Sequence, residues 1–301
     1  MPFDSKETAE FARGDAFSAN FFVPPTAPVA VTYGGGTNVG KVRENNEDHF
    51  AVIRRVRAHE AMLTNLEPGA LAPSEDEAFC FIVADGMGGA AAGEWASRLA
   101  LQRVWDLAGQ ASSWLMKFRD IGGNQVRERI SAFVTELHQT LRDYGNNDPK
   151  LAGMGTTWTS AYSMGWNLLV VHLGDSRAYL YRGGELKQLT KDHTLAQMLI
   201  DKGVAPEETR RVRHILINSL TATDQQAIPD VEHVPLQSGD QILLCSDGLT
   251  DLLEDAEIAE VLGINVGPQS KADALIDLAL AGGGKDNVTA VVAEFRDPTG
   301  K

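Results

Sequence analysis

The chain has 301 residues, of which 27 are basic and 41 are acidic, so its formal net charge is −14. This balance argues against nucleic-acid binding, which requires a basic surface. The sequence contains no run of about 18 apolar residues, so we expect no transmembrane helix, and its first residues lack the basic-then-apolar layout of a signal peptide. We therefore expect a cytoplasmic protein with no membrane partner.

The first third of the chain predicts an extension, two strands and a helix. Residues 1–36 contain PPTAP and GGG and show little periodicity, which indicates a weakly structured extension. On this interpretation, truncation before Thr37 leaves a soluble and active domain. Residues 58–78 form a polar excursion between two strands that has room for a short helix, and residues 95–108 predict a helix.

The clearest helix is predicted over residues 124–145, where Asn124 suits the cap and Gly145 suits the end. Its apolar residues recur every three or four positions: Val126, Ile130, Val134, Leu137 and Leu141. Residues 156–190 predict strands joined by turns at Met164-Gly165 and Gly183-Gly184. Residues 270–283 open with a Ser-x-x-Asp capping signature and predict a further helix.

Helices and strands thus occur in blocks rather than in strict alternation. Adjacent strands joined by short turns imply antiparallel pairing. The sequence therefore predicts an α+β fold with packed sheets, and not a doubly wound parallel sheet.

Two apolar runs end in the same way. FCFIVADGMGG (79–89) and QILLCSDG (241–248) each lead through small residues to an Asp-Gly pair, at Asp85 and Asp247. Three further places put carboxylates at predicted strand edges: Glu47-Asp48, Asp175 and Asp286. A single Asp-Gly is usually only a turn, and each of the other places has an equally plain explanation. Several such carboxylates together are harder to explain as turns.

Carboxylates that gather repel one another, by roughly 1–4 kcal/mol for each pair at about 4 Å. Bound cations remove this repulsion. Since the candidate ligands are all oxygens and no His/Cys grouping has zinc spacing, Mg²⁺ or Mn²⁺ fits best. The adjacent glycines would let a backbone carbonyl approach an ion and leave room for its waters. Cys80 and Cys245 lie inside apolar runs and are interpreted as small buried hydrophobes.

An ordered set of motifs in this chain resembles the metal-dependent Ser/Thr protein phosphatases of type 2C, and its Asp-Gly-Met-Gly-Gly form resembles their bacterial branch. The motifs are Arg43-x-x-x-Glu47-Asp48, Asp85-Gly86-Met87-Gly88-Gly89, Gly155-Thr156-Thr157, Gly174-Asp175-Ser176-Arg177, Asp247-Gly248 and Asp286-Asn287. The likeness covers about residues 37–296. It implies a four-layer α-β-β-α sandwich of two antiparallel sheets flanked by helices, with a catalytic domain at 37–297.

The resemblance also implies a role for each motif residue. Asp85 would bridge two Mn²⁺ or Mg²⁺ ions, Asp247 and Asp286 would complete the first, and Glu47 and the Gly86 carbonyl the second. Asp48 would hold ion-bound water, Arg43 would bind the substrate phosphate, and Asp175 with Asp247 would form a third ion site. The implied reaction is hydrolysis of phosphoserine and phosphothreonine in proteins by a metal-bridging hydroxide.

One position departs from many eukaryotic relatives, which carry a histidine after the Asp-Gly where this chain has Met87. A thioether cannot donate a proton, so water or another group must protonate the leaving oxygen. His49, His193 and His214 are the candidates in the sequence, although a structural or exposed role is the simpler interpretation of each.

Two other classes of function stay open: a catalytically weak regulator that binds phosphoproteins, and a hydrolase of small phosphoesters. A regulator of that kind usually loses a metal carboxylate, and none is missing here. Residues 190–225 resemble the flap that faces substrate, and Arg210, Arg211 and Arg213 there would suit acidic peptides or a solvated helix face. The expected partners are phosphorylated proteins, as targets of a Ser/Thr kinase, and the expected state is a monomer.

Overall fold

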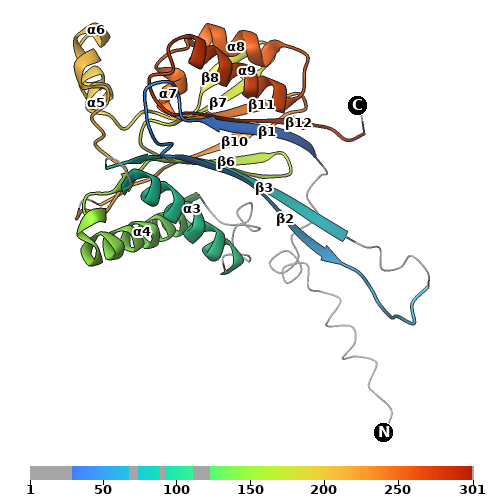
Figure 1. Ribbon diagram of the computed structural model, residues 1–301. Helices are drawn as coiled ribbons and strands as arrows, with labels where there is room; N and C mark the ends of the chain where they lie inside the picture. Colours follow the sequence, from blue (N-terminus) through green and yellow to red (C-terminus); the bar gives the residue numbers. More distant parts are fainter. Residues whose placement is uncertain (1–28, 68–73, 89–91, 111–122, 225, 300–301) are drawn as a thin grey trace.

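The computed structural model describes residues 29–67, 74–88, 92–110, 123–224 and 226–299 (Figure 1). Two antiparallel sheets lie face to face in the middle of the molecule, with one group of helices outside each sheet (Figure 1). The sequence prediction of a four-layer α-β-β-α sandwich is thereby confirmed. In the part of the chain that the structure describes, every helix falls short of the length or apolar character needed to cross a membrane.

One sheet has five strands, and all of its neighbouring pairs are antiparallel. Its order is β1 (Ala30–Asn38), β12 (Val288–Arg296), β11 (Gln241–Cys245), β7 (Arg177–Arg182) and β8 (Glu185–Gln188). The β7–β8 hairpin turns at Gly183-Gly184, as its sequence predicts.

The other sheet has seven strands and is built around a long hairpin. Its order is β10 (Asp230–Pro235), β6 (Asn167–Leu173), β5 (Trp158–Met164), β3 (Ser74–Met87), β4 (Gly155–Thr156) and β9 (Leu220–Thr221), while β2 (Asp48–His59) pairs with β3. The pairing of β3 with β5 begins only at Ala78. The hairpin therefore reaches beyond the sheet, and strand structure occupies both ends of the predicted excursion at 58–78. The described part of its connection holds no helix.

The helices cover the outer faces of the sheets (Figure 1). Helices α3 (Ala92–Gln110) and α4 (Gly123–Asn147) pack on the seven-stranded sheet, and α7 (Asp247–Thr250), α8 (Asp255–Gly263) and α9 (Pro268–Ala281) pack on the five-stranded sheet. Helices α5 (Leu195–Asp201) and α6 (Pro206–Thr209) stand at one end of the molecule, followed by the 3₁₀ turn η4 (Arg210–Val212); another 3₁₀ turn, η3 (Pro149–Leu151), follows α4.

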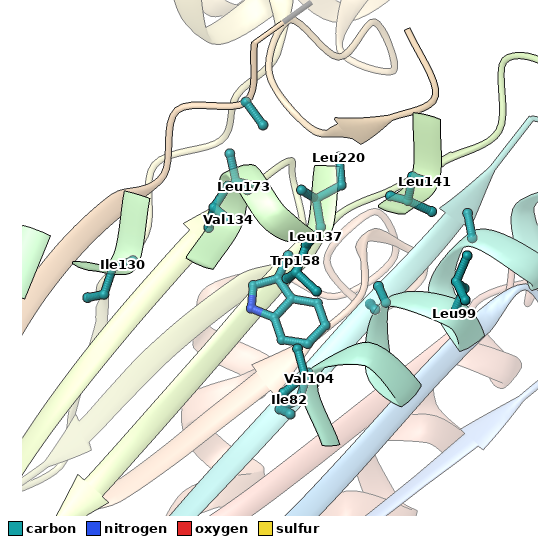
Figure 2. Close-up of a cluster of buried hydrophobic side chains, with 14 of the residues drawn as sticks. Ile82, Leu99, Val104, Ile130, Val134, Leu137, Leu141, Trp158, Leu173 and Leu220 are labelled. Carbon is teal, nitrogen blue, oxygen red and sulfur yellow. The ribbon is translucent and has the colours of Figure 1, made fainter. Parts of the chain in front are cut away.

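The apolar stripe of α4 explains its position. Ile130, Val134, Leu137 and Leu141 are buried and share a cluster with Trp158 and Leu173 of the sheet (Figure 2). The stretch of β3 from Ala78 to Ala84 is apolar because both of its faces are covered. Phe81 and Val83 point between the sheets, whereas Ile82 and Ala84 point toward the helices.

Two helix boundaries differ from their sequence signals. Gly145 does not end α4, which continues to Asn147, because Gly145 lies buried against Ala222 and its missing side chain serves packing. The Ser-x-x-Asp signature at Ser270 does not open α9, which begins two residues earlier at Pro268. Proline suits the first helical turn, where its missing NH costs no hydrogen bond.

The predicted extension over residues 1–36 is wrong in its last part. Residues 30–36 belong to β1, which pairs with β12 along its whole length from Ala30 opposite Arg296 to Asn38 opposite Val288. The run Gly34-Gly35-Gly36 lets α9 lie close to this strand, since a side chain on Gly34 would collide with the backbone of Gln269. Residues 1–28 lie outside the described residues.

Candidate functional site

Three of the predicted carboxylates lie at one end of the β2–β3 hairpin. Asp48 is the first residue of β2 and stands directly opposite Asp85 in β3. The backbone NH of Gly86 donates a hydrogen bond of 3.1 Å to the carbonyl oxygen of Glu47. The register of the hairpin therefore brings Glu47, Asp48 and Asp85 to one place.

The other three carboxylates come from the five-stranded sheet. Asp247 follows β11 as the first residue of α7, whereas Asp175 and Asp286 each lie two residues before a strand, β7 and β12. Because β11 runs antiparallel to both β7 and β12, its end lies beside their starts. All three carboxylates consequently occupy the same edge of this sheet.

Hydrogen bonds to Asp48 join the two groups across the sandwich. Its Oδ2 accepts a bond of 2.6 Å from the Ser246 hydroxyl and one of 2.7 Å from the Thr289 hydroxyl. Ser246 directly precedes Asp247, and Thr289 is the second residue of β12. The carboxylate ends of the two sheets thus form one continuous site.

The electrostatics of Asp85 and Asp247 also show that the carboxylates gather. The pKa of Asp85 is raised well above its ordinary value, first by burial and then by repulsion from Asp48, Asp247, Asp175 and Asp286. Burial likewise raises the pKa of Asp247, and Asp175 and Asp286 raise it further. Negative charges delivered by five strand ends therefore oppose one another's ionisation, which is the cost that bound cations would remove.

Asp48 has one carboxylate oxygen without a partner. Its side chain is 3% exposed, and Oδ1 is buried with no hydrogen-bond partner, although Oδ2 accepts two bonds. Burial raises the pKa of Asp48 to about 6, against the lowering effect of the Ser246 and Thr289 bonds. A buried carboxylate oxygen is costly to leave unpaired, so Oδ1 suits a hydrogen bond from ordered water beside an ion.

The residues fit an ion that keeps much of its water. Within the described ranges, no three His, Cys, Asp or Glu side chains converge closely enough to ligate one ion by themselves. Mg²⁺ usually retains several waters and takes only one or two protein carboxylates. A spread group of oxygen ligands with an unpaired acceptor at Asp48 agrees with such ions and not with a closed zinc site.

Arg43 lies at the rim of the carboxylate cluster, in the connection between β1 and β2. Its Nη2 donates a hydrogen bond of 2.6 Å to Oδ2 of Asp286, while its side chain is 55% exposed. A guanidinium in this position presents planar donors to solvent beside a strongly negative site, and such donors match the oxygens of phosphate.

The glycines beside Asp85 serve close packing of the backbone. A side chain on Gly86 would come within 2.2 Å of the Gly93 carbonyl oxygen and 2.8 Å of the Glu47 carbonyl oxygen. One on Gly93 would meet the Glu47 carboxylate at 2.5 Å, and Gly88 has φ of +127°. These glycines therefore also let the start of α3 lie against the end of the hairpin, a role that the sequence did not indicate. Gly89 lies outside the described residues.

Several polar residues around the site were not singled out as functional from the sequence. The Thr157 hydroxyl accepts a bond of 2.9 Å from the Asp85 NH, and Ser246 and Thr289 bind Asp48. Asn287 joins the connection that carries Arg43 to the strand that follows Asp286. Thr157 and Asn287 stand in motifs, but no local signal identified their partners, because these lie 72 and about 240 residues away.

The three candidate histidines lie in different surroundings. His193 is held on both ring nitrogens: Nδ1 contacts the Gly174 NH and Asn218 Nδ2, and Nε2 lies 3.1 Å from Asp230 Oδ2. His49 Nδ1 lies 2.9 Å from the Ser97 hydroxyl. His214 is exposed. The contacts of His193 favour the structural interpretation over a mobile proton donor.

The structure favours a solvated face for the arginines of the flap-like segment and a core position for Cys245. Arg210, Arg211 and Arg213 are exposed, and Arg213 donates a bond of 2.9 Å to Asp251. Cys245 is fully buried in the cluster between the five-stranded sheet and its helices. Its thiol is therefore part of the core.

Comparison with known proteins gives a consistent result. The model of the protein phosphatase 2C family matches residues 70–272. The serine/threonine protein phosphatase PstP of Mycobacterium tuberculosis is 36% identical over 89% of this chain, which spans 46% of that relative. The chain thus covers about half the length of that curated relative. The serine/threonine phosphatase stp of Listeria innocua is 30% identical, over 86% of this chain and 93% of the relative.

Solved structures show the same fold. The catalytic domain of PstP, in complex with two manganese ions, is 35% identical with a TM-score of 0.67, covering 90% of this chain and all of that one. The serine/threonine phosphatase Stp1 of Staphylococcus aureus is 27% identical with a TM-score of 0.72, covering 91% of this chain and 97% of that one.

Proposed function

The chain belongs to the protein phosphatase 2C family, and from this premise we propose that it hydrolyses phosphoserine and phosphothreonine in proteins with the help of divalent metal ions. The observation that carries the proposal is the gathering of Glu47, Asp48, Asp85, Asp175, Asp247 and Asp286 from separate strand ends, with Arg43 at their rim. The manganese in the PstP structure supports the choice of ion.

We assign the ion ligands as the family resemblance implies. Asp85 would contact two ions, Asp247 and Asp286 the first, and Glu47 with the Gly86 carbonyl the second; Asp175 and Asp247 would hold a third. No three of these side chains converge on one point in the described residues, so filling the first site requires Asp85, Asp247 and Asp286 to move toward the ion. Two or three Mn²⁺ or Mg²⁺ ions are thus proposed. When bound, such ions lower the pKa of coordinated water toward neutrality and neutralise phosphate charge.

The protein's own side chains would bind the substrate phosphate and orient the attacking water. The exposed guanidinium of Arg43 would take two phosphate oxygens with its planar fork, which a lysine could not reproduce. Oδ1 of Asp48 would accept a hydrogen bond from the attacking water, while Ser246 and Thr289 hold its other oxygen in place. Met87 ends β3 and offers no proton, so the leaving oxygen takes its proton from water.

We further propose that the substrates are targets of a Ser/Thr kinase and that the chain acts as a monomer in the cytoplasm. The acidic composition and the two free cysteines support this setting. The presence of every carboxylate in the cluster argues against a silent phosphoprotein-binding regulator, since such a protein needs no ion ligands.

The test is hydrolysis of phosphoserine and phosphothreonine peptides by chelator-treated protein, with and without added Mn²⁺, beside a small aryl phosphate. We expect peptide hydrolysis that depends on Mn²⁺. No release of phosphate from any peptide would overturn the proposal, and activity on the aryl phosphate alone would favour a small-phosphoester hydrolase.

The variant Asp247→Asn tests the ligand assignment at nearly constant volume. We expect turnover to fall by more than about a hundredfold, because loss of even an outer partner of a metal ligand typically costs about 10–100-fold. The exposed Asp277 of α9 offers a control, Asp277→Asn, that removes the same charge outside the site. Near-normal turnover of Asp247→Asn at saturating Mn²⁺ would contradict the assignment.

A further inference from the structure

The side chain of Asn287 connects two segments that are about 240 residues apart. It is 5% exposed and lies between Asp286 and the first residue of β12. Its Nδ2 donates hydrogen bonds of 2.9 Å to the carbonyl oxygens of Val39 and Asn45. Its Oδ1 accepts a bond of 2.8 Å from the NH of Glu47. One carboxamide therefore binds both ends of residues 39–47.

The chemistry of these partners requires an amide. Two backbone carbonyls need donors and one backbone NH needs an acceptor, which fixes the orientation of the carboxamide and uses three of its four hydrogen bonds. An aspartate of the same shape keeps the acceptor and loses both donors. A glutamine adds a methylene where the surroundings are closed.

Residues 39–47 make further hydrogen bonds to the segment that carries Asp286. The Asn287 NH donates a bond of 2.9 Å to Asp286 Oδ1, and Arg43 donates to Asp286 Oδ2. The Lys41 NH also donates a bond of 2.7 Å to the Gly284 carbonyl. The position of Arg43 relative to the carboxylates is thus defined by residues 284–287.

Apolar packing contributes little to this segment. Residues 41–45 are exposed, and Val42 keeps 67% of its surface open to solvent. Removal of the Asn287 bonds takes away three of the hydrogen bonds that fix this segment, while the cores on both sides of the sheets are unaffected. Substitution of Asn287 should consequently act on the placement of Arg43 and Glu47 more than on global stability.

We propose that Asn287 is a positioning residue, whose carboxamide holds residues 39–47 so that Arg43 meets the substrate phosphate beside the carboxylate cluster. This inference rests on the proposed function, since it assigns the phosphate to that site. Asn287 itself touches neither substrate nor ion in this account. Its effect on substrate binding passes through Arg43.

A double-mutant cycle tests this dependence. The KM for a phosphothreonine peptide is measured at saturating Mn²⁺ for wild type, Asn287→Ala, Arg43→Ala and the double variant. We expect Asn287→Ala to raise KM about tenfold, as expected for the loss of a buried hydrogen-bond network. In the Arg43→Ala background the same change should alter KM by less than about twofold, because the group that Asn287 positions is already absent.

Asn218→Ala is the matched control. Asn218 also makes three side-chain bonds, to the Ile228 carbonyl, the Ile228 NH and His193, but it holds a different segment. The fold-change in KM that Asn218→Ala causes should be the same in the wild-type and the Arg43→Ala backgrounds. Melting temperatures of all variants show whether each one folds, and Asn287→Asp, which leaves no cavity, repeats the cycle if Asn287→Ala unfolds.

The outcomes separate the two proposals. A wild-type chain that does not hydrolyse the peptide overturns the proposed function and this inference with it. An active chain in which Asn287→Ala leaves KM unchanged, or in which its effect multiplies fully with that of Arg43→Ala, overturns this inference alone.

Discussion

At the scale of single residues, Asp48 shows how a side chain can be both secured and left available. Two hydroxyls hold one of its oxygens, and the other oxygen is buried without a partner. Because most buried polar groups are paired, this oxygen is available to a further hydrogen-bond donor. It would accept a hydrogen bond from water held by the divalent ions that we propose for this site.

Gly86 offers a prediction at the same scale. Gly86→Ala should weaken Mn²⁺ binding and lower the melting temperature, because the added methyl would lie 2.2 Å from the Gly93 carbonyl and force the hairpin end away from α3. Overpacking of this kind typically costs about 1–3 kcal/mol. Thermal unfolding and a Mn²⁺ titration of the variant measure both effects.

Gly267→Ala is the control, since a methyl at Gly267 meets nothing within 4 Å and that residue has no left-handed backbone. We expect Gly267→Ala to leave Mn²⁺ binding unchanged and to melt within about 4 °C of the wild type, because Gly267 caps α9 and alanine is a poorer N-cap by about 1 kcal/mol. A Gly86→Ala variant that binds Mn²⁺ and melts as the wild type does would show that the close approach of Gly93 is unimportant.

Only some of the site residues could be predicted from the sequence alone. Asp85 and Asp247 were predictable because each follows an apolar run and precedes glycine, a local pattern. The partners of Asp48 were not, because Ser246 and Thr289 lie 198 and 241 residues away and only the fold brings them near. Asn287 was visible as part of a motif, but its three backbone partners were not.

At the scale of elements, β1 is the clearest departure from the sequence prediction. Its glycines and its lack of apolar alternation predicted an unstructured extension. In the structure the glycines belong to an edge strand and let α9 pack closely against it. The helix over 124–145 was predictable because its apolar stripe is long and regular. The starts and ends of helices were less so, because packing at Gly145 and a proline at 268 outweighed the local capping signals.

The corrected β1 changes the expected effect of truncation. Removal of residues 1–36 deletes most of β1, with the backbone ladder to β12 and the apolar contacts of Val31 between the sheets. We expect this truncation to destabilise the protein by about 2–4 kcal/mol relative to removal of residues 1–28, from the lost burial and hydrogen bonds.

Denaturant unfolding of the two truncated proteins measures this difference directly. Because residues 1–28 are absent from both, the comparison isolates β1. Equal unfolding midpoints would mean that β1 adds nothing to the sandwich, and the original boundary at Thr37 would then be correct.

At the scale of the whole molecule, the carboxylate cluster makes stability depend on pH and on ions. Burial first, and then neighbouring carboxylates, raise the pKa of Asp175 to about 7, and burial raises that of Asp48 to about 6, both from 3.8. Protons therefore bind more tightly to the folded state. The stability that these groups contribute without ions is complete below about pH 4 and is lost as the pH rises through 6 to 7.

We predict that Mn²⁺ raises the melting temperature of chelator-treated protein more at about pH 8 than at about pH 5.5, because ions replace the missing protons only where the carboxylates are charged. Buried His172, whose pKa is lowered to about 4, changes stability in the opposite direction. Its contribution is the same with and without Mn²⁺, so it cancels in this comparison. An equal rise at both pH values would contradict the account.

Calorimetric titration of chelator-treated protein with Mn²⁺ shows whether the separate strand ends form one site for divalent ions. We predict at least two ions bound per wild-type chain and loss of the tight binding in Asp85→Asn, since Asp85 is proposed to contact two ions. A wild-type chain that binds no Mn²⁺, or an Asp85→Asn variant that binds Mn²⁺ as the wild type does, would contradict it.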